Sequence, residues 1–168
     1  PRVQAVERVA LRSALGRVLA EDVVSSIAVP AHDNSAMDGY ALRGSELAEG
    51  AEVAFRIAGA GFAGGRFEGA VGARECVRIM TGAIMPAELD TVVPQEFVRI
   101  EGDVVHVPAG VVRGGDNRRL AGEDLARGEV ALAAGRLLRP PDLGLLASLG
   151  SAEVGVYRRL RVAFFSTG

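Results

Sequence analysis

The sequence predicts a mixed α+β protein that contains an all-β region and the beginning of an α/β layer. Apolar and polar residues alternate in short runs through residues 51–108, with glycine and proline between the runs, which is typical of a small barrel or a bent sheet. Apolar residues at helical spacing occur in two short stretches outside that region. A continuous apolar run over residues 160–165 leads into the small residues 166–168, as a buried strand of an α/β layer often does.

The first part of the chain predicts a strand, a helix and a second strand, in that order. Val9 and Leu11 alternate with polar residues as in a strand. Ser13 is a candidate N-cap for a helix over residues 14–20, and residues 21–24 lead out of it as extended chain.

Residues 30–41 form a polar stretch between apolar segments. Its aspartate, asparagine and serine side chains compete for backbone N–H groups and so favour turns and helix caps. Gly39 lets the backbone turn or approach a ligand closely. Two interpretations stay open: a turn with a short helix capped by Asn34 or Ser35, or a site loop that presents Asp38.

The all-β region is expected to contain short strands joined by turns. Glu101, Gly102 and Asp103 form the turn of a predicted hairpin. Pro94 should interrupt a ladder or lie at the edge of a sheet, because proline has no N–H to donate. The predicted strands cover residues 53–57, 75–80, 91–93, 97–100 and 104–107.

Beyond this region, a polar glycine-rich loop over residues 110–124 precedes short strands over residues 125–138. A helix is expected to begin at Pro140 and Pro141 and to end at Gly150. Two further strands are predicted over residues 152–157 and 160–165. Because the last one is followed only by a few small residues, we expect the chain to be cut where another domain begins.

Composition limits the class of protein. With 168 residues, 49% of them apolar and 24% charged, the chain has room for one ordinary folded domain or two small ones. No apolar run approaches the roughly 18–20 residues of a membrane span, and a net charge of −2 gives no reason to expect nucleic-acid binding. The one cysteine, Cys76, favours a reducing compartment, so we expect a cytoplasmic protein with this residue in its core.

Several kinds of site are excluded or disfavoured. All 19 basic residues are arginine, so a Schiff-base lysine and a Walker lysine are both missing from this sequence. Two histidines far apart and one cysteine do not make a zinc site. Residues 59–64 match G-x-G-x-x-G, but no helix pattern follows to seat a pyrophosphate.

Three polar clusters remain as candidates for chemistry. They are residues 33–38, Thr81 and Gly82 with Asp90, and residues 113–124, where Arg118 and Arg119 lie close to Glu123 and Asp124. Each alone is also explained as a capped turn, a plain turn or a solvated charged loop. Together their carboxylates, hydroxyl and arginines suit an anionic substrate held through a hard divalent cation, with Mg²⁺ on the carboxylates and phosphate on the arginines.

These clusters resemble the three motifs of the molybdopterin molybdenumtransferases, the MoeA and gephyrin E-domain family. The matching segments are residues 33–41 (Asp-Asn-Ser-Ala-Met-Asp-Gly-Tyr-Ala), 78–83 with 90–93 and 95–96, and 117–119 with 122–124. Residues 160–168 look like the first strand of the family's next domain. The likeness runs in order along nearly the whole chain, which therefore resembles the N-terminal portion of such a protein.

The resemblance implies a division into three parts. It implies a discontinuous, elongated α+β domain, a small β domain inserted into it, and the first strand of a truncated α/β pterin-binding domain. These parts would cover residues 1–28 with 123–157, residues 29–122, and residues 158–168, respectively.

The resemblance also implies an activity. Enzymes of this family insert molybdenum from molybdate into adenylated molybdopterin with Mg²⁺, and AMP is released. Asp38, Thr81 and Asp124 match positions implicated in catalysis, with Asp38 and Asp124 as expected Mg²⁺ ligands and Thr81 as a hydrogen-bond donor to an anionic oxygen. The residues expected to bind substrate are Asn34, Ser35, Arg118 and Glu123.

The family's active site forms at a homodimer interface from different domains of two subunits. We therefore expect a homodimer with a composite site, substrate handover from the molybdopterin adenylyltransferase, and no activity from this fragment alone. Two alternatives stay open: a gephyrin-like scaffold of the same fold, which would serve assembly, and a stand-alone β-barrel binding module.

Overall fold

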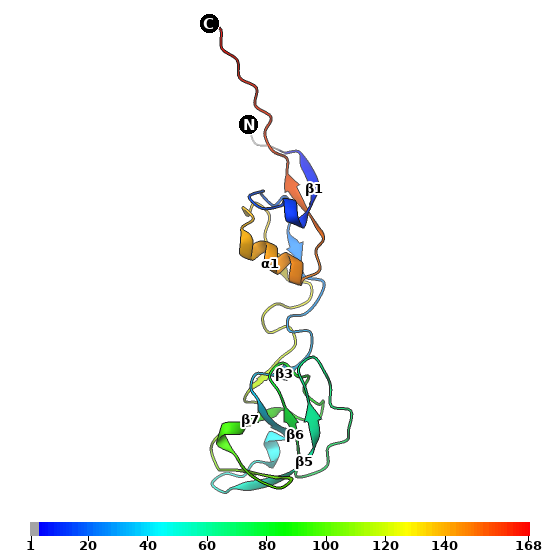
Figure 1. Cartoon of the computed structure of the whole chain (residues 1–168), viewed down its shortest axis with the longest axis vertical. Helices are drawn as coiled ribbons and strands as arrows, with labels where there is room; N and C mark the ends of the chain where they lie inside the picture. The colour runs from blue at the N-terminus through cyan, green and yellow to red at the C-terminus, as the bar shows by residue number, and fades with distance from the viewer. Residues whose placement is uncertain (1–3) are drawn as a thin grey trace. The chain divides into compact units, whose positions relative to one another are not determined.

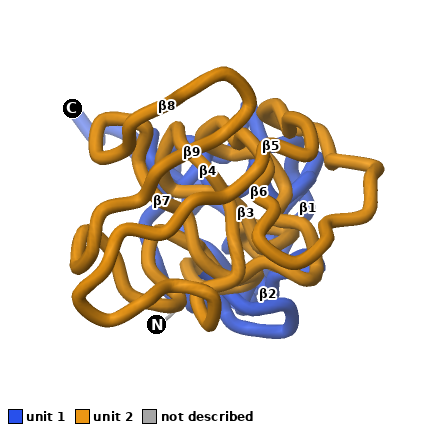
Figure 2. Tube along the Cα trace, turned by 90° about the horizontal axis from the view of Figure 1, so that it is seen from below, with its two compact units in different colours: residues 1–27, 125–168 blue, residues 28–124 orange. Residues whose placement is uncertain are grey.

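The computed structural model describes residues 4–168, and the chain forms two compact units (Figure 2). Unit 1 combines Pro1–Ile27 with Leu125–Gly168, and unit 2 is the segment Ala28–Asp124 that lies between them in the sequence. The described residues contain twelve short strands, one α-helix and three 3₁₀ turns. The structure is therefore sheet-rich, with less helix than the predicted mixed α+β class.

Unit 2 is built on a six-stranded sheet (Figure 1). Its strands are β4 (Gly39–Leu42), β5 (Val53–Gly61), β6 (Glu75–Ile79), β7 (Thr91–Pro94), β8 (Arg99–Glu101) and β9 (Val104–Val107). Their order is β7-β4-β6-β5-β9-β8, and only the neighbours β5 and β6 run parallel. Because β7 and β8 are edge strands of this order, the sheet is open, which is compatible with the expected barrel-like or bent sheet.

Strands β4 and β7 are buried on both faces of this sheet. Along β4, Tyr40 and Leu42 pack into one apolar cluster and Ala41 packs into another, because successive side chains of a strand point to opposite faces. In β7, Val93 joins the first cluster and Val92 the second. This two-sided packing explains why every residue of β4 and β7 is buried.

Most of the predicted strands of unit 2 are confirmed. Ile100 pairs with Val105 in the predicted β8–β9 hairpin, and Pro94 ends the edge strand β7, where its missing N–H interrupts no ladder. Cys76, in β6, is fully buried, as predicted. The segment predicted as a strand from residue 97 begins differently, with a 3₁₀ turn over Gln95–Phe97, because the φ of −57° at Pro94 suits the entry to a turn.

Residues 30–41 contain no helix, so the capped-helix interpretation is wrong. Asn34 and Ser35 form β3, which pairs with β10 (Arg118–Arg119). The Ser35 hydroxyl donates to the Met37 carbonyl at 2.5 Å and accepts from the Met37 N–H at 3.2 Å. Serine thus stabilises a local turn through the same backbone contacts that would otherwise cap a helix.

Unit 1 consists of two short ladders and the helix α1 (Figure 1). The ladders are β1 (Val6–Ala10) with β12 (Glu153–Tyr157) and β2 (Val23–Val24) with β11 (Val130–Leu132). The helix α1 covers Pro140–Ser148, as its prolines and Gly150 predicted, and the Asp142 carboxylate accepts from the N–H of Arg139 at 2.9 Å. Within residues 4–168, no helix has the length and apolarity needed to cross a membrane.

The helix predicted over residues 14–20 is wrong. A 3₁₀ turn covers Leu11–Ser13, and Gly16 then adopts a φ of 70°, which interrupts any α-helix. Leu19 instead pairs with Val156 of β12 through an isolated bridge and is fully buried. The apolar spacing that suggested a helix therefore has several causes: Leu19 is buried against β12, Val18 pairs with Leu137, and Leu15 is exposed.

Residues 158–168 form no strand, in contrast to the prediction for residues 160–165. A strand needs a neighbouring strand to accept and donate its ladder hydrogen bonds. The Arg158 N–H donates to the carbonyl of Ala5 at 2.8 Å, but no other strand of residues 4–168 pairs with residues 160–165. Its large apolar side chains are exposed: Leu160, Val162, Phe164 and Phe165.

Candidate functional site

The three polar clusters of the sequence come together in unit 2. The Ser35 N–H donates to the carbonyl of Ala83 at 3.0 Å, and the Gly82 N–H donates to the carbonyl of Ser35 at 2.9 Å. The Ala36 N–H donates to the carbonyl of Asn117 at 2.9 Å. Backbone hydrogen bonds from the first cluster therefore hold the loop after β6 on one side and the start of β10 on the other.

Asp38 and Thr81 form the contact between the first and second clusters. Asp38 lies in the turn before β4, and Thr81 follows β6, which is paired with β4. The Asp38 Oδ1 accepts from both the N–H and the hydroxyl of Thr81, each at 2.7 Å. The Thr81 N–H, followed by its hydroxyl, lowers the pKa of Asp38, so this exposed carboxylate stays ionised at neutral pH.

This contact changes the role expected of Thr81. A threonine hydroxyl carries one hydrogen, and here that hydrogen points to Asp38. Thr81 was expected to donate to an anionic oxygen of the substrate. In the structure this hydroxyl donates to the Asp38 carboxylate at 2.7 Å.

Asp33 and Arg118 join the first and third clusters. The Arg118 Nε donates to the Asp33 Oδ2 at 2.8 Å, and the Arg118 Nη2 contacts the same oxygen. The Asp33 Oδ1 accepts from the N–H of Ala121 at 2.7 Å. The Ala121 N–H, and then the guanidinium of Arg118, lower the pKa of Asp33.

Arg119, Glu123 and Asp124 form a compact group in the third cluster. The Arg119 Nη2 donates to the Asp124 Oδ1 at 2.6 Å, and its Nε donates to the Glu123 Oε1 at 3.1 Å. The Glu123 Oε2 also accepts from the N–H of Leu120 at 2.8 Å. The positive charge of Arg119 is thus balanced within its own loop, and the carboxylate contacts raise its pKa.

The two other predicted substrate contacts lie in β3. Ser35 is buried, and its hydroxyl is bonded to the backbone of Met37. Asn34 is half-buried, opposite Arg119 in the β3–β10 ladder, and its backbone forms a bridge to Ile84. Of these two side chains, Asn34 is the one whose exposure allows contact with a ligand.

The carboxylates of this region offer few oxygen ligands for Mg²⁺. The described residues hold no group of three His, Cys, Asp or Glu side chains placed to bind a metal ion. Mg²⁺ is nevertheless often held by one or two carboxylates together with substrate phosphates and water. Asp38 fits that pattern, since it is exposed and its Oδ2 accepts no hydrogen bond from residues 4–168. Asp124 fits less well, because Arg119 already balances its charge.

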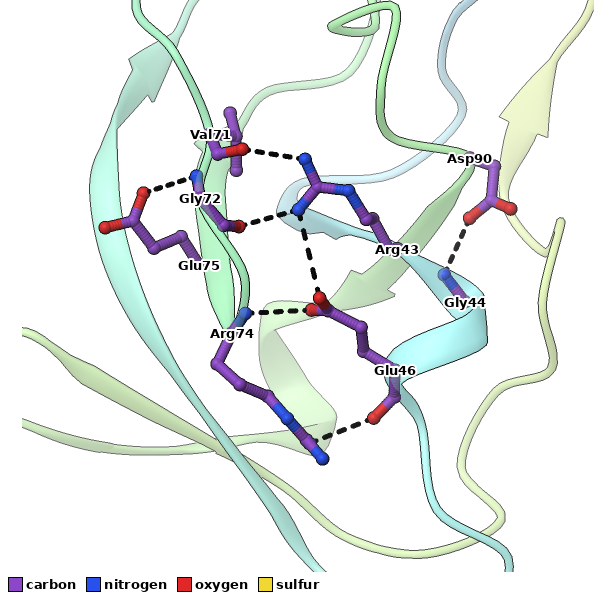
Figure 3. Close-up of polar contacts among 8 residues, drawn as sticks. All are labelled: Arg43, Gly44, Glu46, Val71, Gly72, Arg74, Glu75 and Asp90. Carbon is purple, nitrogen blue, oxygen red and sulfur yellow. Dashed lines mark hydrogen bonds and ion pairs between the residues drawn. The ribbon is translucent and has the colours of Figure 1, made fainter.

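Two carboxylates organise this region although neither is among the predicted catalytic, substrate-binding or metal-binding residues: Asp33 and Asp90. Asp33 belongs to the first motif and binds Arg118, the arginine expected to contact the substrate. The Asp90 Oδ1 accepts from the Gly44 N–H at 2.7 Å (Figure 3). Their places in the motifs were a signal, but nothing in the sequence states which distant residue each one contacts.

A second polar network in unit 2 is structural. The Arg43 guanidinium donates to the carbonyls of Val71 and Gly72 at 2.7 and 2.6 Å, and the Glu46 carboxylate accepts from the N–H of Arg74 at 3.1 Å (Figure 3). Arg74 has a φ of 55°, an uncommon conformation for a residue other than glycine. These contacts fix the turn that leads into β6, the strand before Thr81.

Comparison with known proteins places this geometry in a family context. The chain matches the family described as MoeA N-terminal region (domain I and II) over residues 2–150. It is 44% identical over 158 residues to the molybdopterin molybdenumtransferase of Haemophilus influenzae, covering 94% of this chain and 39% of that protein. The protein of the same name from Synechococcus elongatus is 36% identical over 170 residues, covering 98% of this chain and 41% of that protein.

Comparison with solved structures gives the same family. The molybdopterin biosynthesis MoeA protein from Pyrococcus horikoshii OT3 matches with a TM-score of 0.85 and 35% identity, covering 92% of this chain and 41% of that chain. The chain therefore spans about two fifths of the length of the relatives it matches.

Proposed function

Because the chain belongs to the family of MoeA N-terminal regions, we propose that it is the N-terminal part of a molybdopterin molybdenumtransferase and acts in molybdenum cofactor biosynthesis. The observation that carries the proposal is the Asp38–Thr81 contact, which joins two of the three motifs around one ionised carboxylate. The reaction proposed for the whole enzyme uses molybdate and adenylated molybdopterin and releases AMP.

In this proposal, units 1 and 2 correspond to the discontinuous domain and the inserted β domain, with boundaries at residues 28–29 and 122–123. Residues 158–168 lead into an α/β pterin-binding domain. The whole enzyme is a cytoplasmic homodimer that receives its substrate from the molybdopterin adenylyltransferase. The contacts within unit 2 support a pre-formed half of a composite site, so this chain alone is expected to be inactive.

In this proposal, the site residues of unit 2 have different roles. Asp38 would hold Mg²⁺, and the ion would neutralise part of the negative charge of phosphate and molybdate. Thr81 keeps Asp38 in one orientation, through its hydroxyl and its N–H. Arg118 uses Nε and Nη2 on Asp33 and directs its remaining nitrogen to phosphate. Asn34 and Glu123 lie beside these groups as further substrate contacts, and Asp124 sets the position of Arg119.

The test uses the full reading frame that contains this chain. Asp38→Asn keeps the size of the side chain and removes its charge, and Asp103→Asn, at the exposed hairpin turn, is the matched control. We expect Asp38→Asn to lower molybdate-dependent hydrolysis of adenylated molybdopterin by about a hundredfold or more, the scale of removing one key electrostatic group. Asp103→Asn should keep the wild-type rate.

Two results would contradict the proposal. Equal rates in Asp38→Asn and wild type would mean that residues 30–41 form a structural turn and not a site loop. A wild-type protein that folds but shows no hydrolysis would favour the gephyrin-like scaffold.

A further inference from the structure

The buried hydroxyl of Thr91 joins β7 to the loop that precedes Arg118. Thr91 is fully buried, and its hydroxyl donates to the Asp90 Oδ1 at 2.8 Å. The same hydroxyl oxygen accepts from the N–H of Gly115 at 2.9 Å. A threonine hydroxyl has a single hydrogen, and Thr91 donates it to Asp90. Toward the Gly115 N–H the hydroxyl oxygen can therefore act only as an acceptor. The direction of this chain of hydrogen bonds is therefore fixed.

Asp90 is held as an acceptor at the other end of the chain. Its Oδ1 also accepts from the N–H of Gly44 at 2.7 Å (Figure 3). Burial disfavours the ionised form, but the hydrogen bonds from Gly44 and Thr91 outweigh that effect and lower the pKa of Asp90. The space around it is closed: a Cβ added to Gly44 would lie 2.5 Å from both the Gly114 Cα and the Thr91 Oγ1.

The contacts continue along the backbone toward Arg118. The Val92 N–H donates to the carbonyl of Asp116 at 3.0 Å, and the Asn117 Nδ2 donates to the carbonyl of Val92 at 2.9 Å. Three consecutive loop residues, 115–117, are thus each bonded to the segment 91–92. In the described part of the chain, the side chains of residues 91–92 make no hydrogen bond to Asp33 or Arg118, so the influence of Thr91 on that pair runs through the loop backbone. Asp90 also interacts directly with the positive charge of Arg118, which helps to lower the pKa of Asp90.

Asn117 is the point at which this influence reaches Arg118. It has a φ of 59°, a left-handed conformation that is uncommon for a residue with a side chain. It immediately precedes β10, in which Arg118 lies opposite Ser35. The conformation of Asn117 sets the direction in which β10 starts, and its side chain is bonded to Val92.

We propose that Asp90 and Thr91 are positioning residues that hold Arg118 in place for the phosphate-bearing substrate, acting through residues 115–117. This inference rests on the proposed function, in which Arg118 contacts phosphate. It assigns a role to two buried or half-buried groups that lie outside the predicted set of site residues.

The experiment compares Thr91→Val with Thr91→Ser in the full-length enzyme. Valine has nearly the shape of threonine but no hydroxyl, whereas serine keeps it. We expect Thr91→Val to raise the KM for adenylated molybdopterin about tenfold with a smaller change in kcat. This is the size of effect expected from losing about one hydrogen bond that holds the loop before Arg118. Thr91→Ser should stay within about twofold of wild type. In an Arg118→Ala background, Thr91→Val should add almost nothing, because the group that it positions is already gone.

Amide hydrogen exchange gives a readout independent of turnover. In Thr91→Val we expect faster exchange at the bonded N–H groups of Gly115, Val92 and Ala36, with β5 and β9 unchanged. A uniform rise in exchange across unit 2, or equal KM values for the valine and serine variants, would overturn the proposal. An unchanged KM in Arg118→Ala would also overturn it, while the Asp38→Asn result would still decide the proposed function separately.

Discussion

Asp33 divides its two carboxylate oxygens between partners that lie 85 and 88 positions away in the sequence. One oxygen fixes the Arg118 guanidinium and the other fixes the backbone at Ala121. A single side chain therefore sets both the arginine and the loop that carries Glu123 and Asp124.

Asp33 should also contribute to stability in a pH-dependent way. Its native pKa is lowered, so the ionised form stabilises the native state above the ordinary value of 3.8, and this stabilisation is lost as the pH falls through the native pKa. We expect Asp33→Asn to lower the free energy of unfolding at neutral pH and to flatten its decline in acid, relative to Asp103→Asn. Urea unfolding across that pH range measures both effects, and an acid decline as steep as in wild type would contradict this prediction.

Gly39 is required by its neighbour and not by its own backbone angles. A Cβ at this position would lie 2.0 Å from the carbonyl oxygen of Val93, in the strand paired with β4. We expect Gly39→Ala to destabilise unit 2 by about 3 kcal/mol, since the clash is with backbone in a packed core. Gly61→Ala is the control, because the nearest atom to its added Cβ is 3.9 Å away, an ordinary van der Waals distance. Denaturant unfolding that shows equal losses for both variants would contradict the assignment.

At the scale of elements, α1 offers a substitution with the opposite sign. Gly144 is exposed in the middle of this helix, and nothing lies within 4 Å of an added Cβ. Alanine has the higher helix propensity, so we expect Gly144→Ala to stabilise unit 1 by about 0.5–1 kcal/mol. Thermal unfolding followed by circular dichroism measures the change, and a lower melting temperature would show that the helix packs differently from the structure.

The elements that the sequence predicted well have strong local signals. The helix α1 is bounded by Pro140, Pro141 and Gly150, and the β8–β9 hairpin has Gly102 in its turn with a φ of 61°. The predicted helix over residues 14–20 failed because Leu19 is buried by pairing with Val156, a partner 137 positions later in the sequence. Local spacing cannot distinguish a helix face from a bridged segment when burial has a distant cause.

At the scale of the whole molecule, the ends of unit 2 are bonded to each other. The Gly122 N–H donates to the carbonyl of Pro30, and the Asp124 N–H donates to the carbonyl of Val29, both at 2.9 Å. We therefore expect an excised segment of residues 28–124 to fold alone, because its termini already lie side by side. A cooperative melting transition and a dispersed amide NMR spectrum would support this. A shorter segment of residues 34–119, which lacks both contacts, should be less stable, and equal stability would contradict the argument.

The residues of the site could be predicted from the sequence, but their contacts could not. Sequence motifs picked out Asp38, Thr81 and Arg118, because their residue types suit an anionic substrate and a cation. They could not show that Thr81 donates to Asp38 across 43 positions, or that Asp33 holds Arg118 across 85. Those pairings arise from the β4–β6 and β3–β10 ladders, which only the folded chain defines.

The burial of Cys76 has a practical consequence. Desolvation raises the pKa of this thiol to about 12, and it is the only cysteine of the sequence. The reactive thiolate is therefore scarce in folded protein, and a reagent can reach it only when the sheet of unit 2 opens. The rate at which a thiol reagent labels the native protein should then report the fraction of time that this sheet is open, so Cys76 is a built-in probe of local unfolding. Labelling as fast as that of the urea-unfolded chain would show that β6 is not protected.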